Sequence, residues 1–199
     1  MFIKQLEVGF MAVYCYIVGC PKTKEAVVID PGDEVEKILD AAKREGYAIK
    51  YIFNTHNHSD HTGGNAQLKK LTGAKIAMHA LDAKNRDVDI RLDNETVFKV
   101  GDISFRIIHT PGHTPGGVCF YAEGNLFTGD TLFVGDSGRT DLAGGNRPSL
   151  GISIRKLMEL PGDTVVWPGH NYGPTPSSTL DWERKNNVNA REYGYYSET

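Results

Sequence analysis

A short segment of the chain places four metal-binding side chains close together, in the order His56, His58, Asp60 and His61. It directly follows residues 49–53, a short apolar run that predicts a buried strand. In extended backbone, alternate side chains point to the same side, so His56 and His58 can reach one cation. A turn into the next helix would aim Asp60 and His61 at a neighbouring position. So many titratable groups together would cost folding free energy unless a cation neutralised them, so we expect a metal site.

Three later segments each set a metal-binding residue directly after a glycine at the end of an apolar run. They are Pro111-Gly112-His113, Thr128-Gly129-Asp130 and Pro168-Gly169-His170. Glycine has no Cβ and lets another backbone approach closely, which suits a crowded site. These segments therefore offer three further candidate ligands to the same site.

The elements that must position these residues are predicted as short strands interspersed with helices. We expect strands over residues 10–18, 26–29, 49–53, 75–78, 95–100, 103–109, 118–122, 126–128 and 164–167. We expect helices from 33 to 46, over 64–71 and 150–160, and as one polar helix up to about residue 190. Strands alternate with helices and hairpins are also present, so the pattern favours a mixed, layered α/β arrangement.

Several other titratable residues are predicted to have ordinary structural roles. Asp30 is expected to end a strand in a turn, and Asp33 to cap the helix that follows it. His79 and His109 lie outside the glycine-linked pattern, and we expect them to be hydrogen-bonded residues away from the metal.

Length and charge limit the classes of function. A chain of 199 residues suits one domain, and its net charge of −3 gives no basic stripe for nucleic acid or an anionic membrane surface. The three cysteines have no C-x-x-C spacing, so no disulfide framework or structural zinc site is expected. The apolar stretch 9–19 is too short to span a bilayer. We therefore expect a soluble, cytoplasmic protein with no nucleic-acid or membrane partner.

The H-x-H-x-D-H run, with the three later ligands in this order, closely resembles the metallo-β-lactamase superfamily over roughly residues 10–175. The resemblance implies an αβ/βα sandwich, two mixed β-sheets face to face with helices on the outer faces and the metal site at one edge. It implies a domain over residues 1–175, with a short helix and tail over 176–199 packed on it. It also implies a first ion on His56, His58 and His113, a second on Asp60, His61 and His170, and Asp130 as a bridge.

The implied cofactor is a pair of divalent ions, with zinc favoured and iron or manganese also suited to nitrogen and oxygen ligands. Two ions about 3.5–4 Å apart can share a hydroxide and lower its pKa to roughly 7. Asp60 and Asp130 would then be the catalytic carboxylates, acting with the metal-bound hydroxide. No G-x-S-x-G motif offers a serine nucleophile instead.

Two further runs, 129–142 and 169–175, resemble the short glyoxalase II-type proteins, the hydroxyacylglutathione hydrolase-like group. This resemblance implies hydrolysis of a small-molecule thioester such as a hydroxyacyl-glutathione. A thiolate with a pKa near 8.5 leaves readily, so no dedicated general acid is required. Arg139, Tyr172 and Lys185 are the candidate substrate contacts. Asp130 at the bridging position speaks against a true β-lactamase, and His58 speaks against the diiron electron-transfer branch.

Two alternatives stay open. The Gly138-Arg139-Thr140-Asp141 run also resembles persulfide dioxygenases, which would hold one iron on His56, His113 and Asp130. Arg139 and Asp141 are then expected as a pair that shapes the loop, and the following Leu142-Ala143-Gly144-Gly145 favours the hydrolase. The other alternative is a metal-binding scaffold without turnover, which the complete ligand set argues against.

Full-length glyoxalase II enzymes carry a C-terminal helical domain that holds glutathione through basic residues. After His170 this sequence has room for one helix, on which Arg184 and Lys185 could contact an anion. Exposed basic residues on a polar helix are more often simply solvated. These two residues therefore do not predict that the protein recognises glutathione.

Overall fold

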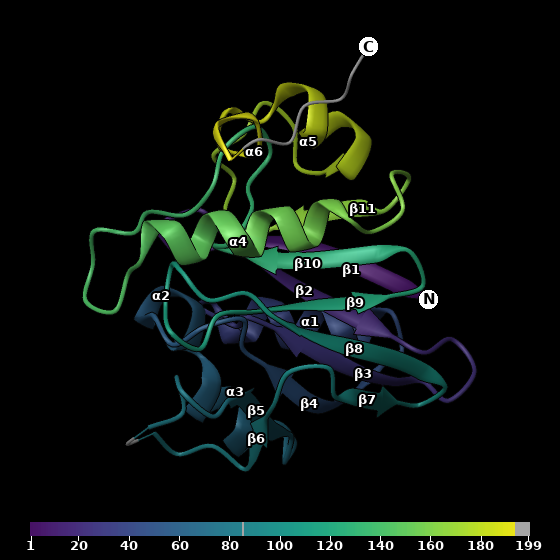
Figure 1. Cartoon of the computed structure of the whole chain (residues 1–199). Helices are drawn as coiled ribbons and strands as arrows, with labels where there is room; N and C mark the ends of the chain where they lie inside the picture. The colour runs from purple at the N-terminus through teal and green to yellow at the C-terminus, as the bar shows by residue number, and fades with distance from the viewer. Residues whose placement is uncertain (85, 194–199) are drawn as a thin grey trace.

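Two mixed β-sheets lie face to face in the computed structural model, which describes residues 1–84 and 86–193 (Figure 1). The first sheet has the order β1 (Phe2–Val8), β2 (Val13–Gly19), β3 (Glu25–Ile29), β4 (Ala48–Phe53), β5 (Lys75–His79) and β6 (Ile90–Leu92). The second has the order β12 (Ser178–Thr179), β11 (Val165–Pro168), β10 (Asn125–Gly129), β9 (Val118–Ala122), β8 (Ile103–His109) and β7 (Val97–Val100). Strands β3 to β6 run parallel, as do β10 and β11.

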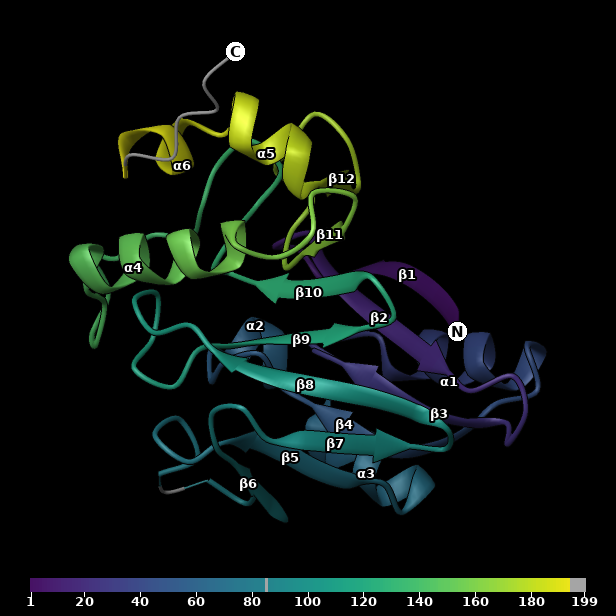
Figure 2. The same ribbon diagram turned by 45° about the vertical axis from the view of Figure 1, so that its right-hand side comes forward.

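The helices cover the outer faces of the two sheets, as Figure 2 shows. They are α1 (Val35–Arg44), α2 (Ser59–Thr62), α3 (Asn65–Thr72), α4 (Arg147–Met158), α5 (Leu180–Asn186) and α6 (Val188–Glu192). Apolar residues of α1 and α3 pack on the first sheet, and those of α4, α5 and α6 pack on the second. The predicted αβ/βα sandwich is therefore confirmed.

The central core lies between the sheets and is rich in aromatic rings. Phe53 of the first sheet stacks on Phe120 of the second, with ring centroids 4.8 Å apart, and meets Phe105 edge to face. All three rings are fully buried. Because such rings bury large apolar areas, this core fixes the two sheets against each other and so fixes the strand ends that carry the site.

The structure differs from the sequence prediction at both ends of the chain. Strand β1 was not predicted, because its side chains are mostly half-buried on an edge strand and show no clear alternation. The predicted strand 10–18 begins too early, since Ala12 has φ 51 in the turn before β2. The single tail helix is wrong: Asn187 is extended, and its side chain accepts hydrogen bonds from Asn189 and Ala190 to start α6. Tail residues 194–199 lie outside the described residues.

The cap predicted for α1 is also wrong. Glu34, in left-handed backbone, occupies the N-cap position, and no side chain caps the helix. The Asp33 carboxylate accepts only the neighbouring Glu34 N–H among the hydrogen bonds of the described residues. Residues before β2 and α1 therefore form tight turns rather than a standard helix start.

The two sheets are joined directly at one edge. Val13 forms an isolated antiparallel bridge with His170, and the Tyr14 N–H donates to the Gly169 carbonyl at 2.8 Å. A Cβ on Gly169 would lie 2.4 Å from Asp130 Oδ1, so only glycine permits this approach. Within the described part of the chain, no helix is both long and apolar enough to cross a membrane.

Candidate metal centre

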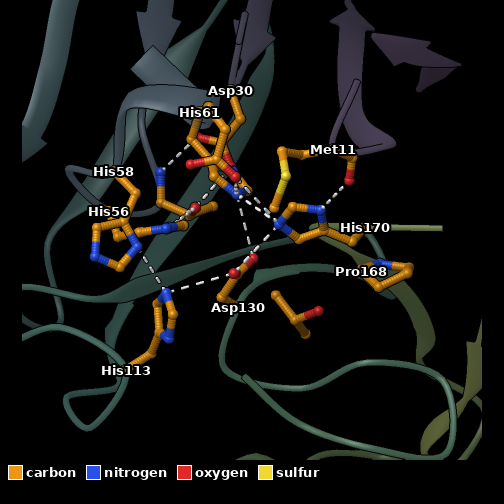
Figure 3. A network of polar contacts seen from close by, with 12 residues as sticks. Met11, Asp30, His56, His58, His61, His113, Asp130, Pro168 and His170 are labelled. Atoms are coloured by element: carbon orange, nitrogen blue, oxygen red, sulfur yellow. Dashed lines mark hydrogen bonds and ion pairs between the residues drawn. The ribbon is translucent and has the colours of Figure 1, made fainter. Parts of the chain in front are cut away.

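The seven predicted ligands converge at the edge where the two sheets meet, although they come from four separate parts of the chain. Figure 3 labels all of them except Asp60. Each part follows the end of a strand or lies on the short helix beside it. His56 and His58 follow β4, Asp60 and His61 lie on α2, His113 follows β8, Asp130 follows β10 and His170 follows β11. Loops that leave a rigid sheet at one edge thus bring distant residues together.

His56, His58 and His113 form the first trio, with ligand atoms that all lie within 4.8 Å of one another. His58 Nδ1 lies 2.9 Å from His113 Nε2. The His56 and His58 rings are nearly perpendicular, as are those of His58 and His113. Three nitrogens therefore face one small volume.

Asp60, His61 and His170 form the second trio, also within 4.8 Å. Asp60 Oδ2 lies 3.6 Å from His61 Nε2 and 3.5 Å from His170 Nε2, and the two nitrogens are 3.0 Å apart. This trio combines nitrogen and carboxylate oxygen, the donor types that suit zinc, iron or manganese.

Asp130 lies between the two trios and touches both. Its Oδ2 is 3.4 Å from His113 Nε2 of the first trio and 3.3 Å from His170 Nε2 of the second. Its Oδ1 is 3.3 Å from His61 Nε2. The carboxylate thus contacts members of both trios, and its role as a bridge between two ions stays a prediction.

The outer nitrogens of four of these rings are held by partners behind the site. His61 Nδ1 is 3.1 Å from Asp30 Oδ2, and His170 Nδ1 is 2.8 Å from the Met11 carbonyl. His113 Nδ1 is 2.6 Å from the Arg139 carbonyl, and His56 Nδ1 is 3.0 Å from Thr55 Oγ1. An Nδ1–H donated outward leaves Nε2 with a free lone pair facing the site.

These residues fit a bound metal. With both Nδ1 atoms donating outward, neutral His61 and His170 would face each other lone pair to lone pair at 3.0 Å. His56 Nε2 and Asp130 Oδ1 are buried and have no hydrogen-bond partner. Buried polar atoms left without partners are costly, and a cation placed among them would satisfy all of them.

The electrostatics of the site favour ligand-competent protonation states of His56 and Asp130, and a protonated His61. Burial, with the neighbouring imidazole of His61, lowers the pKa of His56 well below its usual value, so the ring stays neutral. Burial alone would raise the pKa of Asp130, but His61 and His170 outweigh it and lower that pKa well below its usual range. Burial opposes protonation of His61 too, yet Asp130 and Asp30 raise its pKa to about 9. A cation would displace that proton.

Two buried carboxylates behind the ligands were not recognised in the sequence. Asp30 does form the predicted turn, but its side chain accepts hydrogen bonds from Thr55 N at 2.8 Å and Thr55 Oγ1 at 2.6 Å, besides contacting His61. It therefore orients two ligand rings, those of His56 and His61. It lies directly after β3, which pairs with β4, but the sequence alone does not show that these two strands are neighbours.

Asp82 is the second buried carboxylate behind the ligands. Its Oδ2 accepts from Asn57 N at 3.0 Å and Thr114 Oγ1 at 2.8 Å, and its Oδ1 accepts from Gly116 N at 2.7 Å. Asn57 separates two ligands and Thr114 follows a third, so Asp82 holds the loops of the first trio together. No local pattern in the sequence points to it.

A cavity of about 600 Å³ opens over both trios. Arg139 and Tyr172 line it, as predicted for substrate contacts, whereas Lys185 is not among its lining residues. Lys185 is exposed on α5, and the neighbouring Arg184 donates to the Met158 and Leu160 carbonyls at the end of α4. Neither residue lines this cavity, so an anion contact on α5 stays a prediction.

The Arg139 side chain has the predicted pairing. Its Nε and Nη2 each donate to Asp141 at 2.6 Å in a two-pronged ion pair.

His79 and His109 lie apart from the two trios, and their rings stack with centroids 4.2 Å apart.

Comparison with known proteins places this geometry in a family. Residues 8–170 match the family described as "Metallo-beta-lactamase superfamily". The hydroxyacylglutathione hydrolase of Nitrosococcus oceani is 40% identical over 79% of this chain and 61% of its own length. "Probable polyketide biosynthesis zinc-dependent hydrolase BaeB" of Bacillus velezensis is 32% identical over 88% of this chain and 80% of its own. The chain thus spans about three fifths of the N. oceani protein's length.

Solved protein structures with a similar fold support this family assignment. ETHE1 from Myxococcus xanthus superposes with a TM-score of 0.90 at 30% identity, covering 94% of this chain and 84% of that one. TTHA1623, solved in a di-iron-bound form, has a TM-score of 0.82 at 32% identity, covering 93% of this chain and 98% of that one.

Proposed function

This chain belongs to the metallo-beta-lactamase superfamily, and we propose that it is a metal-dependent hydrolase whose substrate is a thioester. The observation that carries the proposal is the complete double set of ligands, in which Asp130 contacts both trios. The similarity to a hydroxyacylglutathione hydrolase supports the thioester as the bond that is cleaved. We propose two divalent ions as the cofactor, with zinc favoured by the name of the B. velezensis relative.

His56, His58 and His113 would hold one ion, Asp60, His61 and His170 the other, and Asp130 both. When bound, such a pair of cations supplies Lewis acidity to the water and to the carbonyl oxygen. In the reaction the water oxygen bonds to the acyl carbon, and the carbon–sulfur bond breaks. Sulfur leaves with the electron pair as a thiolate, which its low basicity permits without a positioned acid.

Asp60 is the ligand that we assign to proton transfer. Its carboxylate is a quarter exposed and lines the cavity, so a substrate and a water can reach it. With Oδ2 directed at His61 and His170, Oδ1 would hold the proton that the attacking water releases. Asp130, which is buried, keeps the two trios together.

Tyr172 contributes shape to the cavity. Its ring stacks on His170 at 4.5 Å, and its hydroxyl donates to the Met11 carbonyl at 3.0 Å. Both contacts place the ring as a wall beside the second trio, where it would orient the substrate rather than react.

One alternative has an observation in its favour. A persulfide dioxygenase with one iron on His56, His113 and Asp130 fits the Gly138–Asp141 run, and ETHE1 is a structural neighbour that fits it. It gives no role to the second trio, whose three ligand atoms are nevertheless assembled within 4.8 Å. We therefore favour the hydrolase.

The two functions separate in one experiment. The metal-loaded protein is offered S-lactoylglutathione and acetyl-N-acetylcysteamine, with loss of thioester absorbance as the readout. A parallel sample is offered glutathione persulfide in an oxygen electrode. We expect thioester cleavage and no oxygen uptake. Oxygen uptake with one iron per chain and no thioester cleavage would establish the dioxygenase instead.

A further inference from the structure

We infer that the cavity selects thioesters whose acyl group is apolar and whose whole body carries no negative charge, in place of glutathione thioesters. This inference rests on the proposed thioester hydrolysis and names its substrate class. Three features of the cavity carry it: an exposed apolar rim, a cation that is already paired, and an adjoining hollow.

The rim of the cavity is apolar and unusually exposed. The turn between β1 and β2 presents Phe10, which is 94% exposed, and Met11, which is 40% exposed. Leu142 and Tyr172 line the same cavity and are 41% and 55% exposed. A phenyl ring held almost wholly in water has no role in the core, whereas beside a binding cavity it can cover an apolar ligand.

The apolar surface continues from the rim to the second trio. Phe133 lines the cavity, meets Tyr172 edge to face at 5.7 Å and meets His170 at 5.7 Å. Met11 lies beside His170, which binds its carbonyl (Figure 3). An acyl chain attached at the reacting carbonyl would therefore run along rings and thioether rather than along polar groups.

The charges at the cavity disfavour glutathione. Among its described lining residues, Arg139 is the sole lysine or arginine, and both of its prongs are occupied by Asp141. Asp136, which is close to Arg139 in the sequence, also lines the cavity. A glutathione thioester carries two carboxylates and one ammonium, so its net charge is negative, and the one described guanidinium at this cavity is already paired with Asp141.

A second hollow extends the path. It has a volume of about 190 Å³ and shares Phe10, Met11, Ser59 and Asp60 with the main cavity; its other lining residues are Val8, Gly9, Val13, Gly32 and Asp33. The turn carrying Phe10 therefore lines both hollows, which lie next to each other. A chain of several methylenes can lie under this turn, which places Phe10 over its middle.

The test compares three probes on the metal-loaded full chain: acetyl-N-acetylcysteamine, hexanoyl-N-acetylcysteamine and S-lactoylglutathione. Each buried methylene contributes enough to raise kcat/KM about threefold, so hexanoyl should exceed acetyl by more than tenfold. It should also exceed S-lactoylglutathione. Phe10→Ala should lower kcat/KM for the hexanoyl probe about tenfold and leave the acetyl probe within about twofold.

Leu71→Ala is the matched control, because Leu71 is 55% exposed on α3 and does not line either hollow. It should change neither probe. A preference for S-lactoylglutathione, or an equal effect of Phe10→Ala on both acyl lengths, would overturn the inference while leaving thioester hydrolysis intact. Cleavage of none of the three probes would overturn the proposed function, and this inference with it.

Discussion

Asp60 is the ligand whose removal isolates the second trio with the least damage to the fold. The contacts of its carboxylate in the described structure, to His61 and His170, lie inside the site. Asp60→Ala should therefore fold normally, lose about one metal ion per chain and lose hydrolysis by about 100-fold or more. Metal analysis and thioester kinetics on the same sample measure both effects. Full hydrolysis with one ion fewer would show that the second trio has no catalytic role.

Asp130→Ala should have a larger effect than Asp60→Ala. Its carboxylate contacts His61, His113 and His170, so its loss should empty both trios and abolish activity in either proposed scheme. If the two variants prove equally mild, the division into two trios is wrong.

The sequence revealed the ligands better than their supports. The H-x-H-x-D-H run and the three glycine-linked residues were identifiable because cation ligands concentrate unusual residue types at recognisable spacing. Asp30 and Asp82 were not, because a single aspartate after an apolar stretch looks the same in a surface turn and behind a metal ligand. Only tertiary contacts with Thr55, Asn57 and Thr114 reveal what they do.

Helix α5 supports one wall of the cavity from behind. Glu183 is fully buried and accepts from Gly135 N at 3.0 Å and from Asn187 Nδ2 at 2.7 Å, besides Ser178 Oγ. Asn187 Nδ2 also donates to the Phe133 and Asp136 carbonyls. Because Phe133 and Asp136 line the cavity, the C-terminal helices fix the loop that shapes it.

Glu183→Ala should remove the shared acceptor of Gly135 N, Ser178 Oγ and Asn187 Nδ2 and lower the free energy of unfolding by about 2–4 kcal/mol. Glu183→Gln should be mild, because an amide can accept from the same donors and donate to Ser178 Oγ. Lys185→Ala, on the exposed side of α5, is the control and should be neutral. Urea unfolding measures all three, and a neutral Glu183→Ala would contradict the supporting role.

The contribution of Glu183 to stability should also depend on pH. Burial raises the pKa of Glu183 above its ordinary value of 4.5, so the folded state binds this proton more tightly than the unfolded state does. The contribution of Glu183 to stability is therefore greatest below about pH 4.5 and falls as pH rises through the folded-state pKa. The stability of Glu183→Gln relative to the natural protein should rise over that range. A difference that is constant with pH would contradict the assignment.

The sequence predicted most of the strands and helices that carry the site, but it did not predict the strands at the two edges of the first sheet. β4, β8, β10 and α4 follow strong apolar patterns, whereas β1 and β6 are short or half-buried edge strands. The break at Asn187 depends on its side chain capping the next helix, which competes locally with continuation of α5.

For the whole molecule, metal binding and folding should be linked. The site lies where the two sheets are joined by the Val13–His170 bridge, and five imidazoles share it with buried carboxylates. Metal at about 1,000 times its Kd would stabilise the fold by about 4 kcal/mol. Chelation should therefore lower Tm by about 10 °C. Asp130→Ala, lacking the bridge, should show little response, and an unchanged Tm of the natural protein on chelation would contradict this linkage.

A mixed, layered α/β arrangement could be expected from the pattern of elements, but the αβ/βα sandwich could be expected only from the family resemblance. Short apolar strands do not state which sheet they join, and the join at Tyr14 and Gly169 connects residues far apart in the sequence. The apolar rim at Phe10 was likewise hidden, because the sequence placed that residue inside a strand.

The most direct test is the number of metal ions held by the natural chain after purification and dialysis against metal-free buffer, determined by elemental analysis together with anomalous scattering from a crystal. The account predicts two ions per chain, one among His56, His58 and His113 and one among Asp60, His61 and His170, with Asp130 touching both. A single ion confined to the first trio, or none in a folded protein, would contradict it.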